Sequence, residues 1–314
     1  MKPFRKHVAI AIDGGGIRGL IVTRALAALE AYLGQPVHDI FKLAAGTSTG
    51  SIISAGIAAG LSAARMSELY QELGASIFPF SLRKLLFPLT RYRYSSKPFE
   101  QALANHFGNL KMGDIWSSST RVDLVVTAYD LQENRTRFVK PWKEEYAEWT
   151  VLKAVLASCT VPTYFPAVEN RFIDGGVGAY SNPCYVAAYE ARECMEWDPS
   201  ETTLISIGTG RNPYEYSAKK IARSWAWDWI GRVLNVFSQS AYDQQVHLVE
   251  TFFEQLDFRR FQIDLQAPIE MDDVSRMDEL AAYGEYLGQM ILNDETDPIQ
   301  GINLKNLDAQ MRFR

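Results

Sequence analysis

The sequence predicts an α/β fold with three layers, in which a largely parallel sheet carries helices on both faces. Strand-like runs alternate with helical patterns along the chain, and the strand-like runs are almost continuously apolar. Strands of this kind are typical of parallel sheets, because helices cover both faces and leave little strand surface to solvent.

The order of elements follows from these two patterns. We expect strands at residues 7–12, 41–45, 122–128, 137–139, 172–173, 203–207 and 260–265. Apolar residues recur at helical spacing in residues 17–33, 49–59, 65–77, 97–107, 150–158, 183–195, 218–255 and 275–292.

Length and composition favour a single domain over residues 1–314. A chain of 314 residues with 47% hydrophobic residues can bury one large core. The formal net charge of −5 argues against binding to a nucleic acid polymer, because such domains are normally basic.

The cysteines and the start of the chain indicate a reducing, cytoplasmic environment. Cys159, Cys184 and Cys194 show neither C-x-x-C spacing nor a nearby histidine pair, so we expect no disulfide framework and no bound metal or cofactor. Asp13 interrupts the first apolar run, which indicates a strand rather than a signal peptide. Residues 43–64 are uncharged, but their few large apolar side chains favour a helix buried in a core over a membrane span.

A serine motif follows the second predicted strand. The run Gly46-Thr47-Ser48-Thr49-Gly50 matches G-x-S-x-G between the strand at 41–45 and the helix at 49–59. The turn in such a motif is so tight that bulky neighbours would clash, which explains Gly46 and Gly50. It would hold the Ser48 hydroxyl at a helix N-terminus, where the helix dipole favours an oxyanion. Ser48 is therefore the candidate nucleophile.

A serine nucleophile requires a base, and an aspartate fits better than any histidine. None of the four histidines follows a strand end with turn residues around it. Asp174 does, because it ends a short strand and precedes Gly175 and Gly176. An ordinary carboxylate, with a pKa of about 3.9, is a weak base at neutral pH, but partial burial would raise that pKa and improve the match.

The first glycine-rich loop allows two interpretations. "GGGIRG" satisfies G-x-G-x-x-G after a strand, as a dinucleotide-binding turn does. Such a site needs an acid at the end of the second strand, whereas Asp39 precedes its strand and Asp13 would stand beside the phosphates. We therefore expect the amides of Gly14, Gly15 and Gly16 to form an oxyanion hole. Arg18, in the next helical turn, could hold a lipid phosphate, brace the loop or form a surface salt bridge.

The motifs "DGGGIRG", "GTSTG" and "DGG", in this order, resemble the patatin-like phospholipase family. Four further segments, "RYSSKPFEQAL", "TAYDLQENRTRFVKPW", "ASCTVPTYFPA" and "LISIGTG", extend the resemblance over a core at about residues 8–210, before a helical C-terminal part at about 211–314. Two positions depart from the family pattern: Ser51 stands where glycine is frequent, and Ser181 stands where asparagine is frequent.

The resemblance implies a fold, an activity and a regulator. The fold would be a modified α/β-hydrolase-like sheet. The activity would be phospholipase A-type ester hydrolysis of membrane glycerophospholipids, with Ser48 as nucleophile, Asp174 as base and Gly14 to Gly16 as oxyanion donors. Some bacterial members of the family are anti-phage effectors that a cyclic nucleotide activates, so such an activator and peripheral contact with the inner membrane surface are further expectations.

Two segments could contact a membrane or a second copy of the chain. Residues 76–98 combine aromatic and cationic side chains with no acid, which fits either a lid or docking surface or a loop covered by protein. The helical run at 225–237 is apolar round most of its circumference, with a narrow polar stripe at Asp228, Arg232, Asn235 and Gln239. A helix of this kind is usually buried in a core or a subunit interface, so a homo-oligomer is compatible with it.

Two alternatives to a hydrolase follow from the same residues. A nicotinamide-dependent oxidoreductase would use the first glycine loop, but the serine motif and the position of Asp39 disfavour it. A non-catalytic module that senses lipid or nucleotide on the same fold would not need both Ser48 and Asp174.

Overall fold

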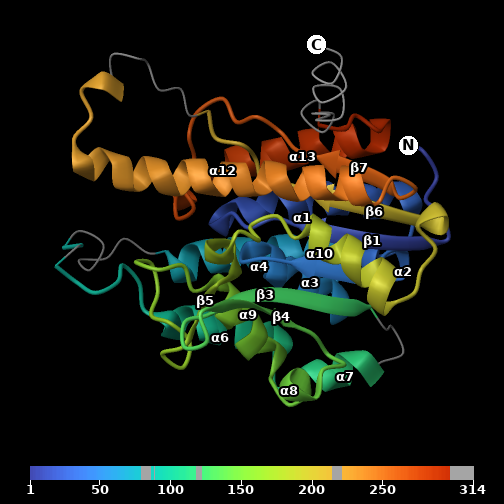
Figure 1. Ribbon diagram of the computed structural model, residues 1–314, viewed down its shortest axis with the longest axis horizontal. Helices are drawn as coiled ribbons and strands as arrows, with labels where there is room; N and C mark the ends of the chain where they lie inside the picture. Colours follow the sequence, from blue (N-terminus) through green and yellow to red (C-terminus); the bar gives the residue numbers. More distant parts are fainter. Residues whose placement is uncertain (79–85, 88, 118–121, 214–220, 298–314) are drawn as a thin grey trace, which may run out of the picture.

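A seven-stranded sheet runs through the molecule in the order β4-β3-β2-β1-β6-β7, and β5 pairs with β3 (Figure 1). The computed structural model describes residues 1–78, 86–87, 89–117, 122–213 and 221–297. The five strands β3, β2, β1, β6 and β7 are parallel to one another. Strands β4 and β5 both run antiparallel to β3. The strands are β1 (His7–Ile12), β2 (Leu43–Gly46), β3 (Asp123–Asp130), β4 (Arg135–Val139), β5 (Phe172–Asp174), β6 (Thr202–Ile207) and β7 (Asp257–Phe261).

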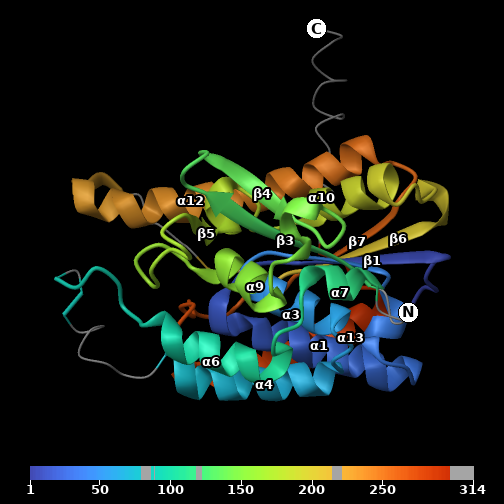
Figure 2. The same cartoon turned by 90° about the horizontal axis from the view of Figure 1, so that it is seen from below.

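Helices cover both faces of the sheet and form the outer two layers (Figure 2). One face carries α1 (Gly19–Leu33), α3 (Thr49–Ala58), α4 (Ala63–Ile77), α6 (Ser96–Phe107), α9 (Val151–Cys159) and α13 (Met277–Asn293). The other carries α10 (Cys184–Tyr189), which continues as a π turn over Glu190–Cys194, and α12 (Ala226–Phe252). Three short helices, α2 (Val37–Ile40), α7 (Met112–Ser117) and α8 (Glu144–Ala147), lie in the connections.

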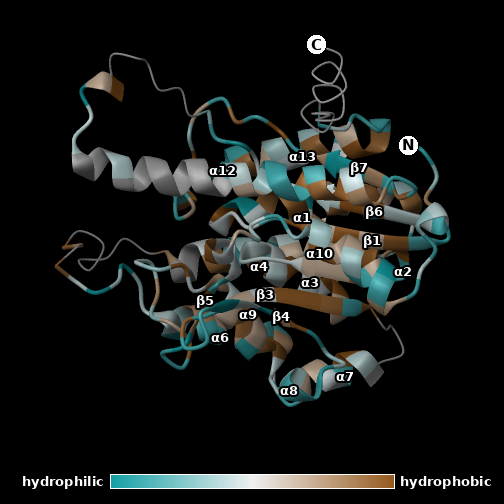
Figure 3. Ribbon diagram, in the orientation of Figure 1, coloured by the Kyte–Doolittle hydropathy of each residue, from teal (hydrophilic) through white to brown (hydrophobic). Residues whose placement is uncertain are grey.

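The alternation of side chains along each strand divides the core in two. In β1, Ile10 and Ile12 pack among the helices of the first face, whereas Ala9 and Ala11 pack under α10 and α12. The small alanine side chains allow α10 to approach the sheet closely. Both sides of the strand are thus buried, which explains its continuous apolar sequence and the hydrophobic sheet at the centre of Figure 3.

Strand pairing brings two distant segments together at one edge of β3. Strand β4 pairs with residues 126–130 of β3, so that edge is occupied. On the opposite edge β2 ends where Gly46 pairs with Val126, and β5 pairs beyond it, with Asp174 opposite Ala128. Because β5 runs antiparallel to β3, its carboxyl end points toward the end of β2. The turns that follow the two strands therefore meet.

The predicted α/β fold and its largely parallel sheet are confirmed. The last strand begins three residues earlier than predicted, at Asp257, and the long helix predicted over 218–255 spans Ala226–Phe252. Every residue of α3 is buried, as predicted for the uncharged run at 43–64. In the part of the chain that the structure describes, no helix has the length and hydropathy of a membrane span.

Candidate active site

Ser48 lies on a strained turn between β2 and α3. Its backbone has φ 54° and ψ −125°, a conformation that non-glycine residues rarely adopt. A Cβ on Gly46 would lie 2.2 Å from the Gly50 carbonyl oxygen, and a Cβ on Gly50 would lie 2.1 Å from that of Ile12. Both glycines are thus required by close backbone contacts, and the turn has the geometry that G-x-S-x-G predicts.

Neighbouring segments hold this turn from several sides. The Ser48 amide donates to the Ser158 hydroxyl at 2.8 Å, and the Ser51 hydroxyl donates to the Ser48 carbonyl at 2.6 Å. The departure from glycine at position 51 therefore adds a hydrogen bond at the turn. A Cβ on Gly14 would lie 3.3 Å from the Cβ of Ser48, so the first glycine loop touches the Ser48 side chain.

Asp174 reaches the same place from the end of β5, and its side chain is buried. Its Oδ1 accepts a hydrogen bond from the Gly176 amide at 2.7 Å. Burial raises the pKa of Asp174 to about 6, while the nearby Ser48 hydroxyl and the Gly176 amide oppose that rise. Within the described residues Oδ2 has no hydrogen-bond partner. Catalytic hydrogen bonds are often long in a free enzyme and tighten when substrate binds.

The amides of the glycine loop are not equivalent. The Gly14 amide donates to the Ser181 carbonyl at 2.9 Å, so it is already occupied. Among the described residues nothing accepts a hydrogen bond from the amides of Gly15 or Gly16, which leaves these two for the role predicted for all three. The Thr49 amide, at the start of α3, is also unoccupied there. Thr49 was not among the residues predicted from the sequence, although the residue after a nucleophilic serine commonly supplies an oxyanion donor.

Arg18 braces the glycine loop. Its Nε donates to the Gly15 carbonyl at 3.3 Å and its Nη1 to the Gly210 carbonyl at 3.2 Å. Of the three roles considered for Arg18, support of the loop is the one that these contacts match. The guanidinium nevertheless borders the cavity described below.

Residues from the C-terminal third of the chain hold the other side of the loop. The Gly14 carbonyl accepts hydrogen bonds from Thr209 Oγ1 at 2.7 Å and from the Tyr242 hydroxyl at 3.2 Å. Asp13 is fully buried, and both of its carboxylate oxygens accept from the Arg260 guanidinium. Asp13 therefore anchors the end of β1 to β7, and its charge is neutralised within the fold.

The histidines occupy other positions. His7 stacks on Trp197 with ring centroids 4.8 Å apart, and His106 contacts Glu72 at 3.1 Å. His247 borders the cavity but contacts Thr251, one turn away on α12. Within the described residues no histidine forms a hydrogen bond with Ser48.

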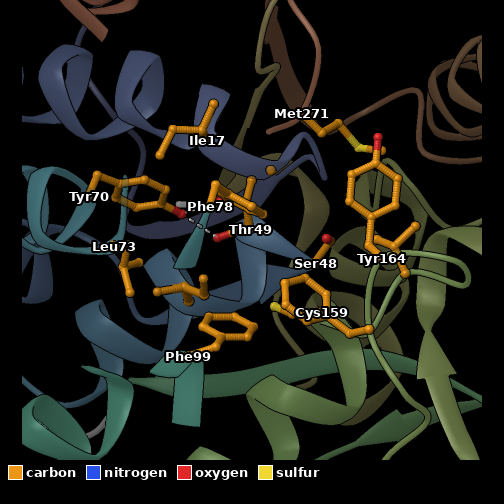
Figure 4. Close-up of a pocket in the computed structure, with 14 residues that line it drawn as sticks. Ile17, Ser48, Thr49, Tyr70, Leu73, Phe78, Phe99, Cys159, Tyr164 and Met271 are labelled. Atoms are coloured by element: carbon orange, nitrogen blue, oxygen red, sulfur yellow. Dashed lines mark hydrogen bonds between the residues drawn. The ribbon is translucent and has the colours of Figure 1, made fainter. Parts of the chain in front are cut away.

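Two cavities meet at Ser48. An apolar pocket of about 50 Å³ extends from Ser48 and Thr49 toward Tyr70, Leu73 and Phe99 (Figure 4). In this view Tyr164 and Met271 lie on the other side of Ser48. The apolar lining of this pocket suits hydrocarbon, and its volume takes only a short hydrocarbon segment.

The second cavity has a volume of about 1080 Å³ and is bordered by both Ser48 and Asp174. Tyr242, His247 and Glu250 give it a wall on α12, which the sequence did not predict. Burial raises the pKa of Glu250 to about 7, so this wall carries a carboxyl group that ionises near neutral pH. The cavity is large enough for the polar part of a lipid.

The two segments predicted to contact membranes are only partly described. In residues 76–98, Tyr94 is buried and donates to Asp272 at 2.6 Å, whereas Leu89 and Arg91 are exposed. Phe80, Arg83 and Lys84 lie outside the described residues.

The helix at 225–237 was expected to be buried in a core or in a subunit interface, and at its two described tryptophans the core of the single chain does not provide that burial. Trp225 and Trp229 are exposed, and the start of α12 extends past the sheet (Figure 1). Gln239 borders the large cavity. The side chains of Asp228, Arg232 and Asn235 lie outside the described residues.

Comparison with known proteins gives consistent matches. A cGAMP-activated phospholipase of Vibrio cholerae is 27% identical over 242 residues, which cover 68% of this chain and 67% of that protein. Patatin-like protein 2 of Arabidopsis thaliana is 27% identical over 338 residues, with coverages of 88% and 82%. The crystal structure of VipD from Legionella pneumophila is similar over 93% of this chain and 67% of that chain, with 12% identity and a TM-score of 0.49.

A family model described as patatin-like phospholipase matches residues 10–188, which is more than half of the chain and includes Ser48 and Asp174. The chain therefore belongs to the patatin-like phospholipase family.

Proposed function

We propose that this chain is a serine-dependent lipid acyl hydrolase that cleaves ester bonds of membrane glycerophospholipids. Asp174 takes the proton from the Ser48 hydroxyl, and Ser48 Oγ attacks the ester carbonyl carbon. The tetrahedral oxyanion accepts hydrogen bonds from the amides of Gly15, Gly16 and Thr49. Asp174 then returns its proton to the departing lysophospholipid oxygen. Water, deprotonated by Asp174, releases the fatty acid from Ser48 and regenerates the hydroxyl.

The observation that carries this proposal is that Ser48, on its strained turn, and the buried Asp174 border the same cavity. A carboxyl with a pKa of about 6 is a stronger base than an ordinary aspartate and is still mostly ionised at pH 7. The dyad thereby supplies a base without a histidine. The apolar lining of the pocket beside Ser48 supports a hydrocarbon group on the acyl side of the ester, and the larger cavity supports a polar headgroup on the other side.

A fluorescent phospholipid assay with Ser48→Ala and Asp174→Asn tests the dyad. Both substitutions should lower kcat/KM by about 10²–10⁴-fold or more. Ser54→Ala is the matched control, because Ser54 is buried on the same helix and its hydroxyl has no partner among the described residues. It should retain full activity. Turnover by Ser48→Ala or Asp174→Asn at the level of the control would refute the mechanism.

Labelling with a fluorophosphonate separates catalysis from lipid or nucleotide sensing on the same fold. A working nucleophile should react at Ser48, and Ser48→Ala should remove the label while Ser54→Ala retains it. A folded chain that stays unlabelled under all conditions would favour the non-catalytic module.

We also infer that a cyclic nucleotide activates the hydrolase, so that it degrades membrane lipid as an anti-phage effector. The names of relatives such as the Vibrio cholerae protein support this inference. Phospholipid hydrolysis should increase when cGAMP is added, and Ser48→Ala should not respond. Equal rates with and without cGAMP would reject activation by this nucleotide and leave the dyad unaffected.

A further inference from the structure

Large apolar side chains are exposed on two segments at the same end of the molecule. Leu86 and Leu89, beyond α4, are 50% and 88% exposed. Ile221, Trp225 and Trp229, around the start of α12, are 42%, 78% and 46% exposed. Figures 1 and 2 both show these segments (teal and orange, at the left) at the end where α12 extends past the sheet. These five residues are called the projecting surface below.

The projecting surface lies on the same two segments of the chain that provide walls of the cavity that reaches Ser48. Arg93, which follows Leu89 after three residues, borders that cavity, as does Gln239 on α12. At 1.5 Å per helical residue, Trp229 lies about 15 Å along α12 from Gln239. Each of the two segments therefore carries exposed apolar side chains at the end of the molecule and, farther along the chain, a residue that borders the cavity in which an ester would react.

The charged side chains beside the projecting surface favour an anionic partner. Arg91 and Arg223 are exposed within these segments, and residues 76–98 contain no aspartate or glutamate. Tryptophan prefers the headgroup level of a bilayer, while arginine faces anionic lipid phosphates. A protein partner would have to match the shape of this surface. Binding to an anionic bilayer requires only that apolar and cationic side chains are exposed together at one end of the molecule.

We propose that the projecting surface docks this chain on an anionic lipid bilayer, with the large cavity facing the headgroups. This docking proposal rests on the proposed function, because a lipid acyl hydrolase must reach an ester bond that lies within a bilayer. Of the six remaining exposed large apolar residues that the structure describes, Val177 borders the large cavity and five lie on separate segments of the chain, as is normal for protein surfaces. The five are Tyr32, Leu131, Tyr189, Phe252 and Tyr286.

Vesicle sedimentation tests the docking surface, in a Ser48→Ala background that spares the lipid. On phosphatidylglycerol–phosphatidylethanolamine vesicles, Trp225→Ser combined with Trp229→Ser should lower the partition coefficient by about 10-fold or more, because two indoles no longer enter the interface. Phe252→Ser is the matched control, since this exposed aromatic lies at the other end of the 27-residue α12, about 40 Å away. It should change the partition by less than about twofold.

Two further measurements do not depend on the double variant. Arg223→Glu should weaken binding to phosphatidylglycerol vesicles more than binding to phosphatidylcholine vesicles, because only the former attract a cation. Brominated acyl chains should quench tryptophan fluorescence of the Ser48→Ala chain. Absence of quenching, with and without added cGAMP, would overturn the proposal.

The remaining outcomes also decide the question. Unchanged partition of the double variant would overturn docking through this surface. A lower oligomeric mass by light scattering, with unchanged partition, would identify the surface as a contact between copies of the chain and overturn docking as well. With Ser48 intact, hydrolysis of a water-soluble short-chain ester should survive the double substitution. If Ser48→Ala hydrolysed the soluble ester as fast as the chain with Ser48, the proposed function would be refuted. The partition measured on vesicles would not be affected by that outcome.

Discussion

Asp174→Asn should abolish hydrolysis and, at the same time, stabilise the fold at neutral and alkaline pH. The native structure holds a buried carboxylate whose Oδ2 lacks a partner among the described residues, and burial raises its pKa from 3.8 to about 6. In the unfolded chain the same group is exposed to water. Ionisation therefore costs free energy in the native state, and an asparagine at this position carries no charge to desolvate.

The size of the effect follows from the two pKa values. The raised native pKa means that the folded chain binds the proton more tightly than the unfolded chain, so the carboxyl destabilises the fold as pH rises from about 4 through 6. The penalty reaches about 3 kcal/mol above pH 6. Between pH 4 and pH 8, the unfolding free energy of Asp174→Asn should therefore gain about 2.5 kcal/mol relative to the unsubstituted chain.

Urea unfolding at pH 4, 6 and 8 measures this difference, and the same preparations are assayed for hydrolysis. The comparison across pH cancels any constant effect of the amide. Asp39→Asn makes the same chemical change at an exposed position away from the site and serves as the matched control. A difference for Asp174→Asn that does not grow with pH would refute the raised pKa, and with it the argument that Asp174 is a strengthened base.

Three other predictions follow from the same geometry. The value of kcat/KM should rise with pH through about 6 as Asp174 ionises. Glu250→Gln should show the same rise, because Glu250 is not in the dyad. A pH profile without this rise would contradict the role of Asp174 as the base. Gly50→Ala should destabilise the fold by about 3 kcal/mol or more in urea unfolding, because its Cβ would lie 2.1 Å from the Ile12 carbonyl oxygen. Leu73→Ala enlarges the apolar pocket, so in a series of soluble esters the preference should shift toward longer acyl chains. The substitution should lower the unfolding free energy by about 2–5 kcal/mol. An unchanged chain-length preference would exclude the apolar pocket as the acyl site.

Local sequence patterns predict the turns that form the site, but they do not predict which turns come together in the fold. The turn at Ser48 could be predicted because its requirements lie within five residues, where the small size of Gly46 and Gly50 is visible in the sequence. The position of Asp174 could be predicted in the same way, from a strand end and the glycines that follow. Their catalytic roles remain predictions. What joins them is the pairing of β2 and β5 with one edge of β3, and that pairing depends on contacts remote in sequence.

Contacts between distant segments explain what the sequence could not predict. The Gly14 amide is occupied because the Ser181 carbonyl, 167 residues later, lies within hydrogen-bonding distance. Arg260 carries no local motif, yet it neutralises Asp13 because β7 and β1 both flank β6. The apolar pattern of the helix at 225–237 predicted burial in a core or a subunit interface, and in the single chain the start of the helix extends beyond the sheet with Trp225 and Trp229 exposed (Figure 1). A periodic pattern shows which face is apolar, but it does not show whether another element lies there to cover it.

The C-terminal third of the chain is therefore part of the site rather than an appendage to it. The family match ends at residue 188, but Thr209 and Tyr242 hold the Gly14 carbonyl, and Arg260 holds the aspartate that precedes it. Because Tyr242 lies on α12, the same helix that projects its exposed tryptophans also touches the loop whose amides are proposed to bind the oxyanion. The hydrogen bond from the Tyr242 hydroxyl to the Gly14 carbonyl thus makes α12 one of the elements that position this loop.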